Sequence, residues 1–198
     1  MKKNIFIIIA VLISVIGYSQ DFNTNISTAK DAYKAGNLEQ AHFALQKAMQ
    51  EIDMIIGKEV LKLLPAKMDT LSMNTNDDNV SSNMGFAGAT IHRSYGNDNR
   101  KAILEIISNS PMVAMLNNLF NMPAIAGMND ANSQTIKLQG YKARLERKSG
   151  NTEGKYNYEL QVPLGSALIS FTVDDITEKE MIEMANTIPL AKVAKLIQ

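Results

Sequence analysis

Two different spacings of apolar residues divide the chain. In residues 24–64 apolar side chains recur at steps of three and four residues, which is the spacing of an α-helix. Gly36 and Asn37 interrupt this pattern, with Gly36 suited to the end of one helix and Asn37 to the N-cap of the next. Gly57 is a candidate break in the second helix, and Pro65 ends it. We therefore expect a helical hairpin within residues 20–65.

From Phe86 onward apolar and polar residues alternate, as they do in half-buried strands. In the first expected strand Ala89, Ile91, Arg93 and Tyr95 share one face. Clean alternation means one buried face and one wet face, which antiparallel sheets allow. About six strands are expected, over residues 86–95, 101–108, 135–138, 141–146, 156–162 and 167–173.

Three further signals predict helices after the hairpin. Pro111 opens an apolar segment that follows the second strand. Thr177 and Glu180 form a capping-box pattern ahead of a helix that Pro189 separates from a last turn. The expected order is a helical hairpin followed by ββαββββα, an α+β fold with an antiparallel sheet and helices packed on one face.

Residues 66–85 are polar and suggest a linker between the hairpin and an α+β sandwich domain over residues 86–198. The run from Asn74 to Asn79 resembles a calcium loop in composition. An EF-hand needs glycine at its sixth position and glutamate at its twelfth. Those positions, counted from Asn74, hold Asn79 and Gly85, so a solvated loop is the favoured interpretation.

The hairpin resembles a single tetratricopeptide-type repeat. The residues that carry the resemblance are Ala29, Gly36, Leu38, Ala41, Leu45 and Ala48. Repeats of this kind form a peptide-binding groove only when about three are stacked. The resemblance therefore implies a helical hairpin, and the favoured role of its two amphipathic helices is packing on the rest of the chain.

The rest of the chain resembles Mog1/PsbP-like sandwich domains and uncharacterised bacterial exported proteins that join a TPR-like helical hairpin to such a sheet. The matching residues are Leu63-Leu64-Pro65, Arg93-Ser94-Tyr95, Gln139-Gly140-Tyr141-Lys142-Ala143 and Ile188-Pro189-Leu190. Such proteins usually carry Gly-Trp soon after the proline, and this chain contains no tryptophan. The resemblance implies a fold and brings no activity with it.

The first 19 residues have the pattern of a secretory signal peptide. Lys2 and Lys3 precede an apolar run from Ile5 to Ile16, and Gly17 and Ser19 suit cleavage after Ser19. The run is shorter than the roughly 20 residues that span a bilayer. The alternative is an uncleaved N-terminal anchor. We expect a periplasmic or secreted protein without a stable membrane anchor after cleavage.

The amino-acid composition excludes several classes of partner and of functional site. Cleavage removes two lysines and no acidic residue, so the mature chain has 18 basic and 20 acidic residues. Nucleic-acid binding needs clustered basic residues, and we expect no such partner. The chain has no cysteine, which excludes disulfides, thiol catalysis, cysteine zinc sites and a lipoprotein anchor.

Candidate catalytic groups are few. His42 lies in the expected second helix, and His92 lies on the polar face of a strand. Asp174 and Asp175 form an acidic pair just before a helix, where capping and the helix dipole favour acids. Gly165-Ser166 lacks the second glycine of a nucleophile elbow. We expect no catalytic residue, no cofactor and no metal site.

Methionine is unusually frequent, and four residues, Met112, Met115, Met122 and Met128, cluster around the expected central helix. Methionine fills cores and lines promiscuous binding surfaces, and its thioether also binds copper(I). These three interpretations stay open, with core packing favoured. The candidate surface for an apolar ligand or a partner consists of Met112, Met115, Leu116, Leu119, Phe120 and Met122.

The favoured function is an exported, non-enzymatic module that binds a partner protein in the cell envelope. One alternative is a binder of a lipid or another apolar ligand, in a cavity between the helix over residues 111–128 and the inner face of the sheet. The sheet residues expected there are Ile136, Leu138, Tyr156, Tyr158 and Phe171. A second alternative is a hydrolase with an unrecognised site. The oligomeric state stays open.

Overall fold

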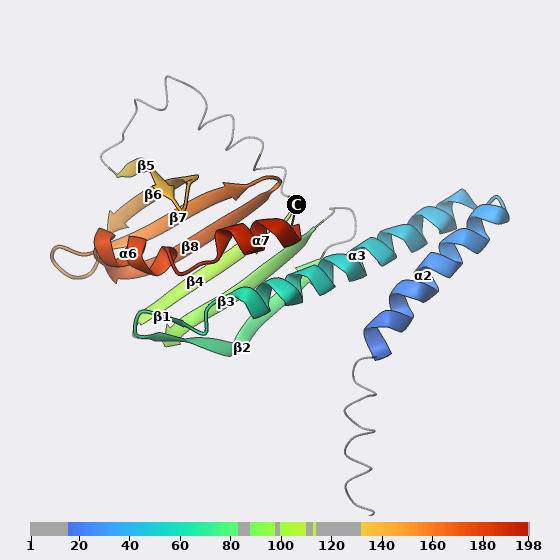
Figure 1. Ribbon diagram of the computed structural model, residues 1–198, viewed down its shortest axis with the longest axis horizontal. Coiled ribbons are helices and arrows are strands. Elements are labelled where there is room, and N and C mark those ends of the chain that lie inside the picture. Colours follow the sequence, from blue (N-terminus) through green and yellow to red (C-terminus); the bar gives the residue numbers. More distant parts are fainter. Residues whose placement is uncertain (1–15, 83–87, 98–99, 110–112, 114–131, 198) are drawn as a thin grey trace, which may run out of the picture. The chain divides into compact units, whose positions relative to one another are not determined.

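The computed structural model describes residues 16–82, 88–97, 100–109, 113 and 132–197 (Figure 1). These residues form two compact units. The first contains residues 16–55 and Ser82, and the second contains residues 56–81 together with the described residues from Gly88 onward.

The first unit is built on the predicted helical hairpin. Helix α2 covers Ile16–Lys34 and helix α3 covers Leu38–Leu63. Gly36 has φ +75°, and the Asn37 amide donates to the Ala32 carbonyl at 2.9 Å, which closes α2 with the usual left-handed turn. Asn37 then caps α3, because its Oδ1 accepts from the Gln40 amide at 3.1 Å. The predicted boundaries of the turn are confirmed.

Gly57, a candidate break in the sequence, does not interrupt α3. A Cβ atom at this position would lie 2.4 Å from Val80 Cγ1 and 3.3 Å from Ile91 Cγ1. The absence of a side chain therefore lets the last turns of α3 lie directly against the sheet. Glycine is needed at this position because the sheet packs closely against it, and the helix does not bend there.

We expect Gly57→Ala to reduce the free energy of unfolding by about 1 kcal/mol. Overpacking against Val80 costs about 1–3 kcal/mol, and the better helix propensity of alanine returns about 1 kcal/mol. In a Val80→Ala background the same substitution should become neutral or stabilising. Urea denaturation of the four proteins of this double-mutant cycle measures the coupling, and additive effects would contradict the packing explanation.

The second unit contains an open antiparallel sheet of eight strands in the order β1-β2-β3-β4-β8-β7-β6-β5 (Figure 1). The α+β class is confirmed, but the expected number of six strands is wrong. The predicted six correspond to β3 through β8. The bounds are β1 Lys67–Met68, β2 Leu71–Ser82, β3 Ala89–Asn97, β4 Arg100–Ile107, β5 Ser133–Leu138, β6 Tyr141–Ser149, β7 Tyr156–Leu164 and β8 Ala167–Ile176.

The two additional strands replace most of the expected polar linker. β1 and β2 occupy residues that were assigned to a linker or a calcium-like loop. The error has a physical reason: most of β2 is exposed or half-exposed, and its core contacts are limited to Leu71 and Val80, with Asp78 bonded to Arg93. Apolar alternation therefore gave no signal for this strand.

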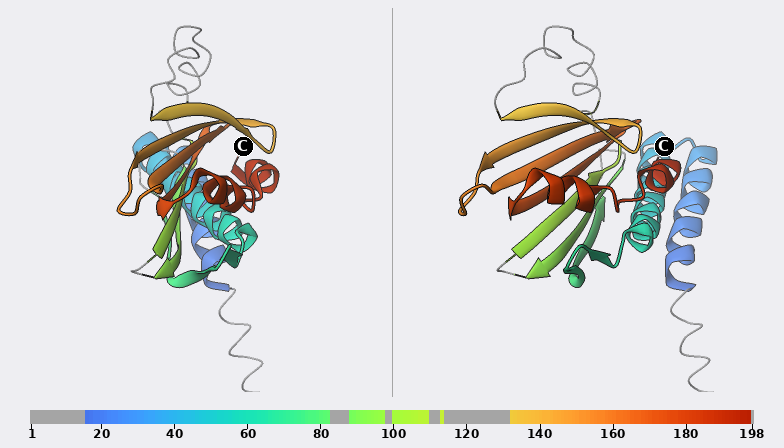
Figure 2. Two further views of the ribbon diagram at one scale, coloured as in Figure 1. Left: turned by 90° about the vertical axis from the view of Figure 1, so that its left-hand side faces the viewer. Right: turned by 60° about the vertical axis from the view of Figure 1, so that its left-hand side comes forward.

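One face of the sheet carries the core. A row of buried side chains crosses four strands in register, Leu104 on β4, Phe171 on β8, Leu160 on β7 and Leu145 on β6, each 2% exposed or less. Helices α6, Glu178–Ala185, and α7, Leu190–Ile197, lie along this face (Figure 2). Their buried residues join the same cluster, namely Met181, Met184, Ala185, Leu190, Val193, Ala194 and Ile197.

The predicted capping box of α6 is present. The Glu180 amide donates to Thr177 Oγ1 at 3.3 Å, and the Thr177 amide donates to Glu180 Oε2 at 3.0 Å. These bonds hold the pKa of Glu180 below its usual value. The helix ends ahead of Pro189, as expected, so α6 and α7 are separate short helices.

Candidate functional site

The contact between α2 and α3 is made largely of alanine. Small side chains let two helices approach closely, and they leave the larger apolar residues of each helix outside the contact. The alanines are nearly inaccessible, at 2–6% exposure: Ala29, Ala32, Ala41, Ala44 and Ala48. The hairpin is therefore held together without its largest hydrophobic side chains.

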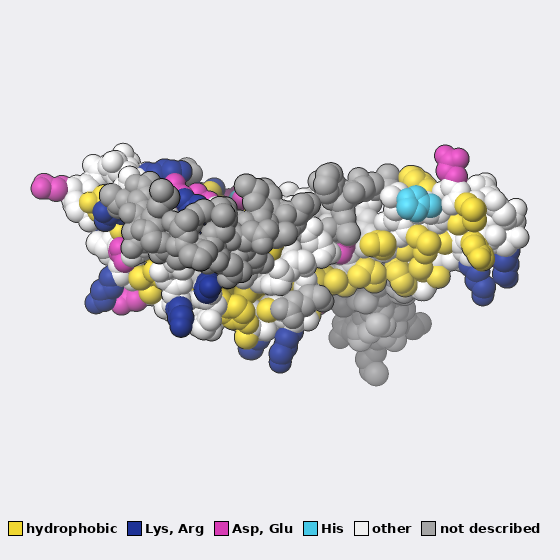
Figure 3. Space-filling view, turned by 90° about the horizontal axis from the view of Figure 1, so that it is seen from above, with side chains coloured by type: hydrophobic (Ala, Val, Ile, Leu, Met, Phe, Trp, Pro, Cys, Tyr) yellow, Lys and Arg dark blue, Asp and Glu magenta, His cyan; other side chains and the backbone are white. Residues whose placement is uncertain are grey.

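Those larger side chains form an exposed surface, which we call the apolar face. It consists of Ile26, Tyr33, Leu38, Leu45, Met49 and Ile52. Three of them are more than half exposed, Tyr33 at 70%, Leu38 at 64% and Met49 at 54%. Figure 3 shows the resulting band of hydrophobic side chains along the hairpin. A contiguous apolar surface of this kind is typical of an interaction site.

Helical geometry explains why these residues share one side. Leu38, Leu45, Met49 and Ile52 are separated by seven, four and three residues, which brings them onto a single stripe of α3. Ile26 and Tyr33 are seven apart on α2. Phe43 lies on the opposite side of α3, where the Lys47 ammonium sits 4.8 Å from the centre of its ring. The hairpin thus has one apolar face and one mainly polar face.

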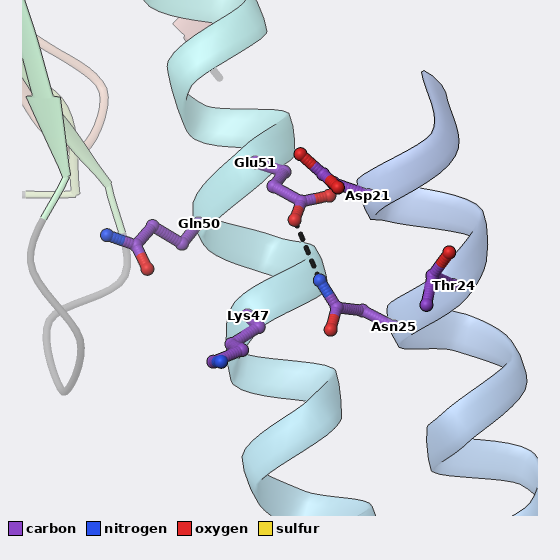
Figure 4. A pocket seen from close by; sticks show the side chains of 6 residues that line it. All are labelled: Asp21, Thr24, Asn25, Lys47, Gln50 and Glu51. Atoms are coloured by element: carbon purple, nitrogen blue, oxygen red, sulfur yellow. Dashed lines mark hydrogen bonds between the residues drawn. The ribbon is translucent and has the colours of Figure 1, made fainter. Parts of the chain in front are cut away.

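The polar face contains a hollow of about 350 Å³. Its lining comes from both helices and consists of Asp21, Thr24, Asn25, Lys47, Gln50 and Glu51 (Figure 4). The carboxylates of Asp21 and Glu51 lie close together, and Asn25 Nδ2 donates to Glu51 Oε1 at 2.7 Å. The hollow offers hydrogen-bond donors and acceptors from both helices.

The Glu51 carboxylate is in an unfavourable environment in this hollow. Its Oε2 is buried and accepts no hydrogen bond within the described residues. Burial raises the pKa of Glu51, and the negative charge of Asp21 raises it further. Within the described residues no group of three or more histidine, aspartate or glutamate side chains is placed to hold a metal ion.

Glu51→Gln should make the hairpin more stable at pH 7, by less than about 1 kcal/mol at this partly exposed site. A raised folded-state pKa stabilises the fold fully below the unfolded value of 4.5, and this contribution is lost as the pH rises through the folded pKa. The advantage of the glutamine variant should therefore shrink below pH 4.5. Thermal unfolding followed by circular dichroism at several pH values measures it.

The exposed Glu153→Gln is the matched control for that experiment. It should leave the difference from the native chain flat across the same pH range. A pH-independent effect of Glu51→Gln would contradict the explanation by burial and like charge.

A second polar cluster lies in the sheet unit and is structural. Arg93 is only 7% exposed, and it donates from Nε to Asp78 Oδ1 at 2.8 Å and from Nη2 to Asp78 Oδ2. Its Nη1 donates to the Leu61 carbonyl at 2.8 Å, at the C-terminal end of α3. One guanidinium therefore joins α3, β2 and β3. Burial raises the pKa of the neighbouring Tyr95 to about 12, so its hydroxyl stays protonated.

The histidine and acids considered for hydrolysis are not brought together. His92 Nδ1 lies 3.3 Å from Glu105 Oε1 on the next strand, and Glu105 is paired in register with Ser170. A catalytic triad needs the histidine between the acid and the serine, and here the acid lies between the other two. His42 is exposed on α3.

Asp175 has a structural partner instead of a capping role. It lies at the end of β8 with φ +53°, where its carboxylate accepts from the Thr152 amide at 2.8 Å and the Thr152 hydroxyl at 2.6 Å. These bonds hold its pKa below the usual value. Asp174 is exposed, and the cap of α6 is Thr177, so the acidic pair does not cap the helix. Ser166, in the turn between β7 and β8, donates from Oγ to Oδ1 of Asn109, which follows β4, at 2.9 Å.

The methionine-rich candidate surface lies outside the described residues, and so does the expected helix over residues 111–128 except Val113, which is buried. The opposing wall of the expected cavity is described. Leu138, Tyr158 and Phe171 belong to the core with α6 and α7, and Ile136 and Tyr156 pack at its margin.

Helical spacing alone does not distinguish the apolar face from the contact between the helices. Leu38 and Leu45 of the face fall in the same repeat-like pattern as Ala41 and Ala48. The available signal was residue size, because alanines at positions 41, 44 and 48 form their own helical stripe beside the large residues. Two adjacent apolar stripes on one helix indicate two packing surfaces.

No helix within the described residues is long and apolar enough to cross a membrane. Comparison of the chain with protein-family models, with curated proteins and with solved structures finds no match.

Proposed function

We propose that this protein is an exported, non-enzymatic module that binds a partner protein through the apolar face of its helical hairpin. The observation that carries the proposal is the placement of six large apolar side chains outside the alanine-lined contact between α2 and α3. They do not hold the hairpin together, and their exposure costs free energy in water. A partner that covers them offsets that cost.

The geometry favours a helical partner. The exposed apolar residues form a row along each of two helices, and an amphipathic helix can pack on such rows with apolar residues at three- and four-residue steps. Tyr33 and Met49 suit the centre of the contact, because aromatic residues and methionine are enriched in the cores of protein interfaces.

Export is part of the proposal and is supported by the pattern of residues 2–19. The measurement is the intact mass and N-terminal sequence of the protein recovered from an expressing bacterial culture. We expect the mature chain to begin at Gln20, with or without cyclisation of that residue. Recovery of a chain that retains residues 1–19 would remove the export part of the proposal.

Binding is tested by photo-crosslinking from single positions on α3. A photoreactive amino acid replaces Leu45 on the apolar face, and in a control protein it replaces Phe43. These residues are 48% and 45% exposed and lie two positions apart on opposite sides of the same helix. We expect a discrete protein adduct in the envelope fraction from position 45 and none from position 43. Equal labelling at both positions, or none at either, would overturn the proposal.

A further inference from the structure

We infer that the apolar face takes a second copy of this chain, and that two hairpins form a four-helix bundle. The inference rests on the proposed function, since it names the partner for the same surface. It is argued from the distribution of charge along the two edges of the apolar face and from the symmetry of an antiparallel hairpin.

Opposite charges border the apolar face. Lys30 and Lys34 lie along the α2 edge, and Glu39 lies on the α3 edge, all three exposed. Lys34 is in the last turn of α2 and Glu39 is in the first turn of α3, so both are level with the turn that joins the helices. Figure 3 shows basic and acidic side chains on opposite edges of the band at this end.

The direction of the twofold axis determines which edge of the partner lies against each edge of the apolar face. In a twofold dimer with its axis parallel to the helices, α2 of one copy lies over α3 of the other, at the same height along the bundle. Lys34 of each copy then approaches Glu39 of the other, so two attractive pairs form. A twofold axis across the helices would instead set α2 on α2 with the two turns at opposite ends of the bundle. Lys34 of one copy would then not meet Glu39 of the other, so these attractive pairs favour the parallel axis.

The size of the surface sets the expected strength. Leu38 to Ile52 rises about 21 Å along α3, and two helices about 10 Å wide each give a face of about 400 Å² in each copy. The contact is therefore below the standard interface size, and we expect a reversible dimer with a dissociation constant in the micromolar range.

Sedimentation equilibrium of the purified protein over a range of concentrations tests the inference. We expect the mass to rise from monomer to dimer. Leu45→Ser combined with Met49→Ser should weaken association at least about tenfold, and Phe43→Ser on the opposite side of α3 should not change it. A monomer at all concentrations, or a dimer insensitive to the Leu45/Met49 pair, would overturn the inference.

A charge exchange tests the orientation of the two hairpins. Lys34→Glu and Glu39→Lys should each weaken the dimer, and the double variant should restore it because both intermolecular pairs are rebuilt with reversed sign. Circular dichroism checks that each variant keeps its helical content. Failure of the double variant to recover association would reject the arrangement with α2 over α3.

The crosslinking result separates this inference from the proposed function. An adduct from position 45 with twice the mass of the chain supports both. An adduct with a different protein, together with a monomer in solution, overturns the second copy and leaves the binding function standing. Neither adduct nor dimer would remove both.

Discussion

Arg93→Ala should lower the free energy of unfolding by about 3–5 kcal/mol, because it leaves the Asp78 carboxylate without its partner in a mostly buried setting. Asp78 is only 18% exposed in its side chain. The substitution also removes the donor to the Leu61 carbonyl at the end of α3. Urea denaturation at pH 7, followed by circular dichroism, measures the loss.

Arg100→Ala is the matched control for that prediction. Arg100 has a side chain 35% exposed and lies 3.6 Å from both Asp69 and Glu180. Pairs of this exposed kind contribute about 0–1 kcal/mol. Arg93→Lys should fall between the two, since it keeps the charge and loses the two-pronged contact. Equal losses for Arg93→Ala and Arg100→Ala would show that the buried cluster does not stabilise the sheet unit.

Phe171→Ala should cost about 3–5 kcal/mol, through lost burial and the cavity that remains. Phe171 is fully buried and is paired in register with Leu104 on one side and Leu160 on the other. Phe171→Leu should cost less, because it fills most of the same volume. Denaturant midpoints of the two variants give the comparison.

Tyr33→Ala, on the apolar face, provides the contrast with Phe171→Ala. Its side chain is as large as that of Phe171 but is 70% exposed. Its removal should change the stability of the chain by no more than about 0.5 kcal/mol at concentrations where the chain is monomeric. A large loss on Tyr33→Ala would mean that the apolar face supports the fold, and this would weaken its interpretation as a binding surface.

Much of the fold is readable from the sequence because most of its elements follow apolar spacing. The hairpin turn at Gly36 and Asn37, strands β3 to β8 and the Thr177 capping box all have local signals. The strand β2 has none, because its inward position facing Arg93 is Asp78. A strand whose partner is a charge and not a hydrophobic layer cannot be found by counting apolar residues.

One clue to that strand was present at Arg93. It shares a face with Ala89, Ile91 and Tyr95, and a buried arginine requires an acidic partner. Adjacent acids at Asp77 and Asp78 were available in the segment that looked like a linker. The need for charge neutralisation would have placed that segment beside β3.

The candidate site shows a different limit. The three- and four-residue spacing predicts the helices correctly, but it does not show which apolar residues of one helix are covered by the other. That depends on how closely α2 and α3 approach, which the alanines at positions 29, 32, 41, 44 and 48 determine. Side-chain volume, and not hydrophobicity, distinguishes the residues in the contact between α2 and α3 from those on the apolar face.

The polar composition of β2 has a consequence for solubility. This strand pairs with β1 at Leu71 and Ser72, and the Met73 amide donates to the Ala66 carbonyl at 2.9 Å, so within the described residues most of its outer backbone edge has no neighbouring strand. An open edge invites strands of other molecules, and charged or amide side chains discourage such recruitment. The polar run from Asn74 to Asn79, which includes two aspartates, thus disfavours aggregation by pairing of this edge with strands of other molecules.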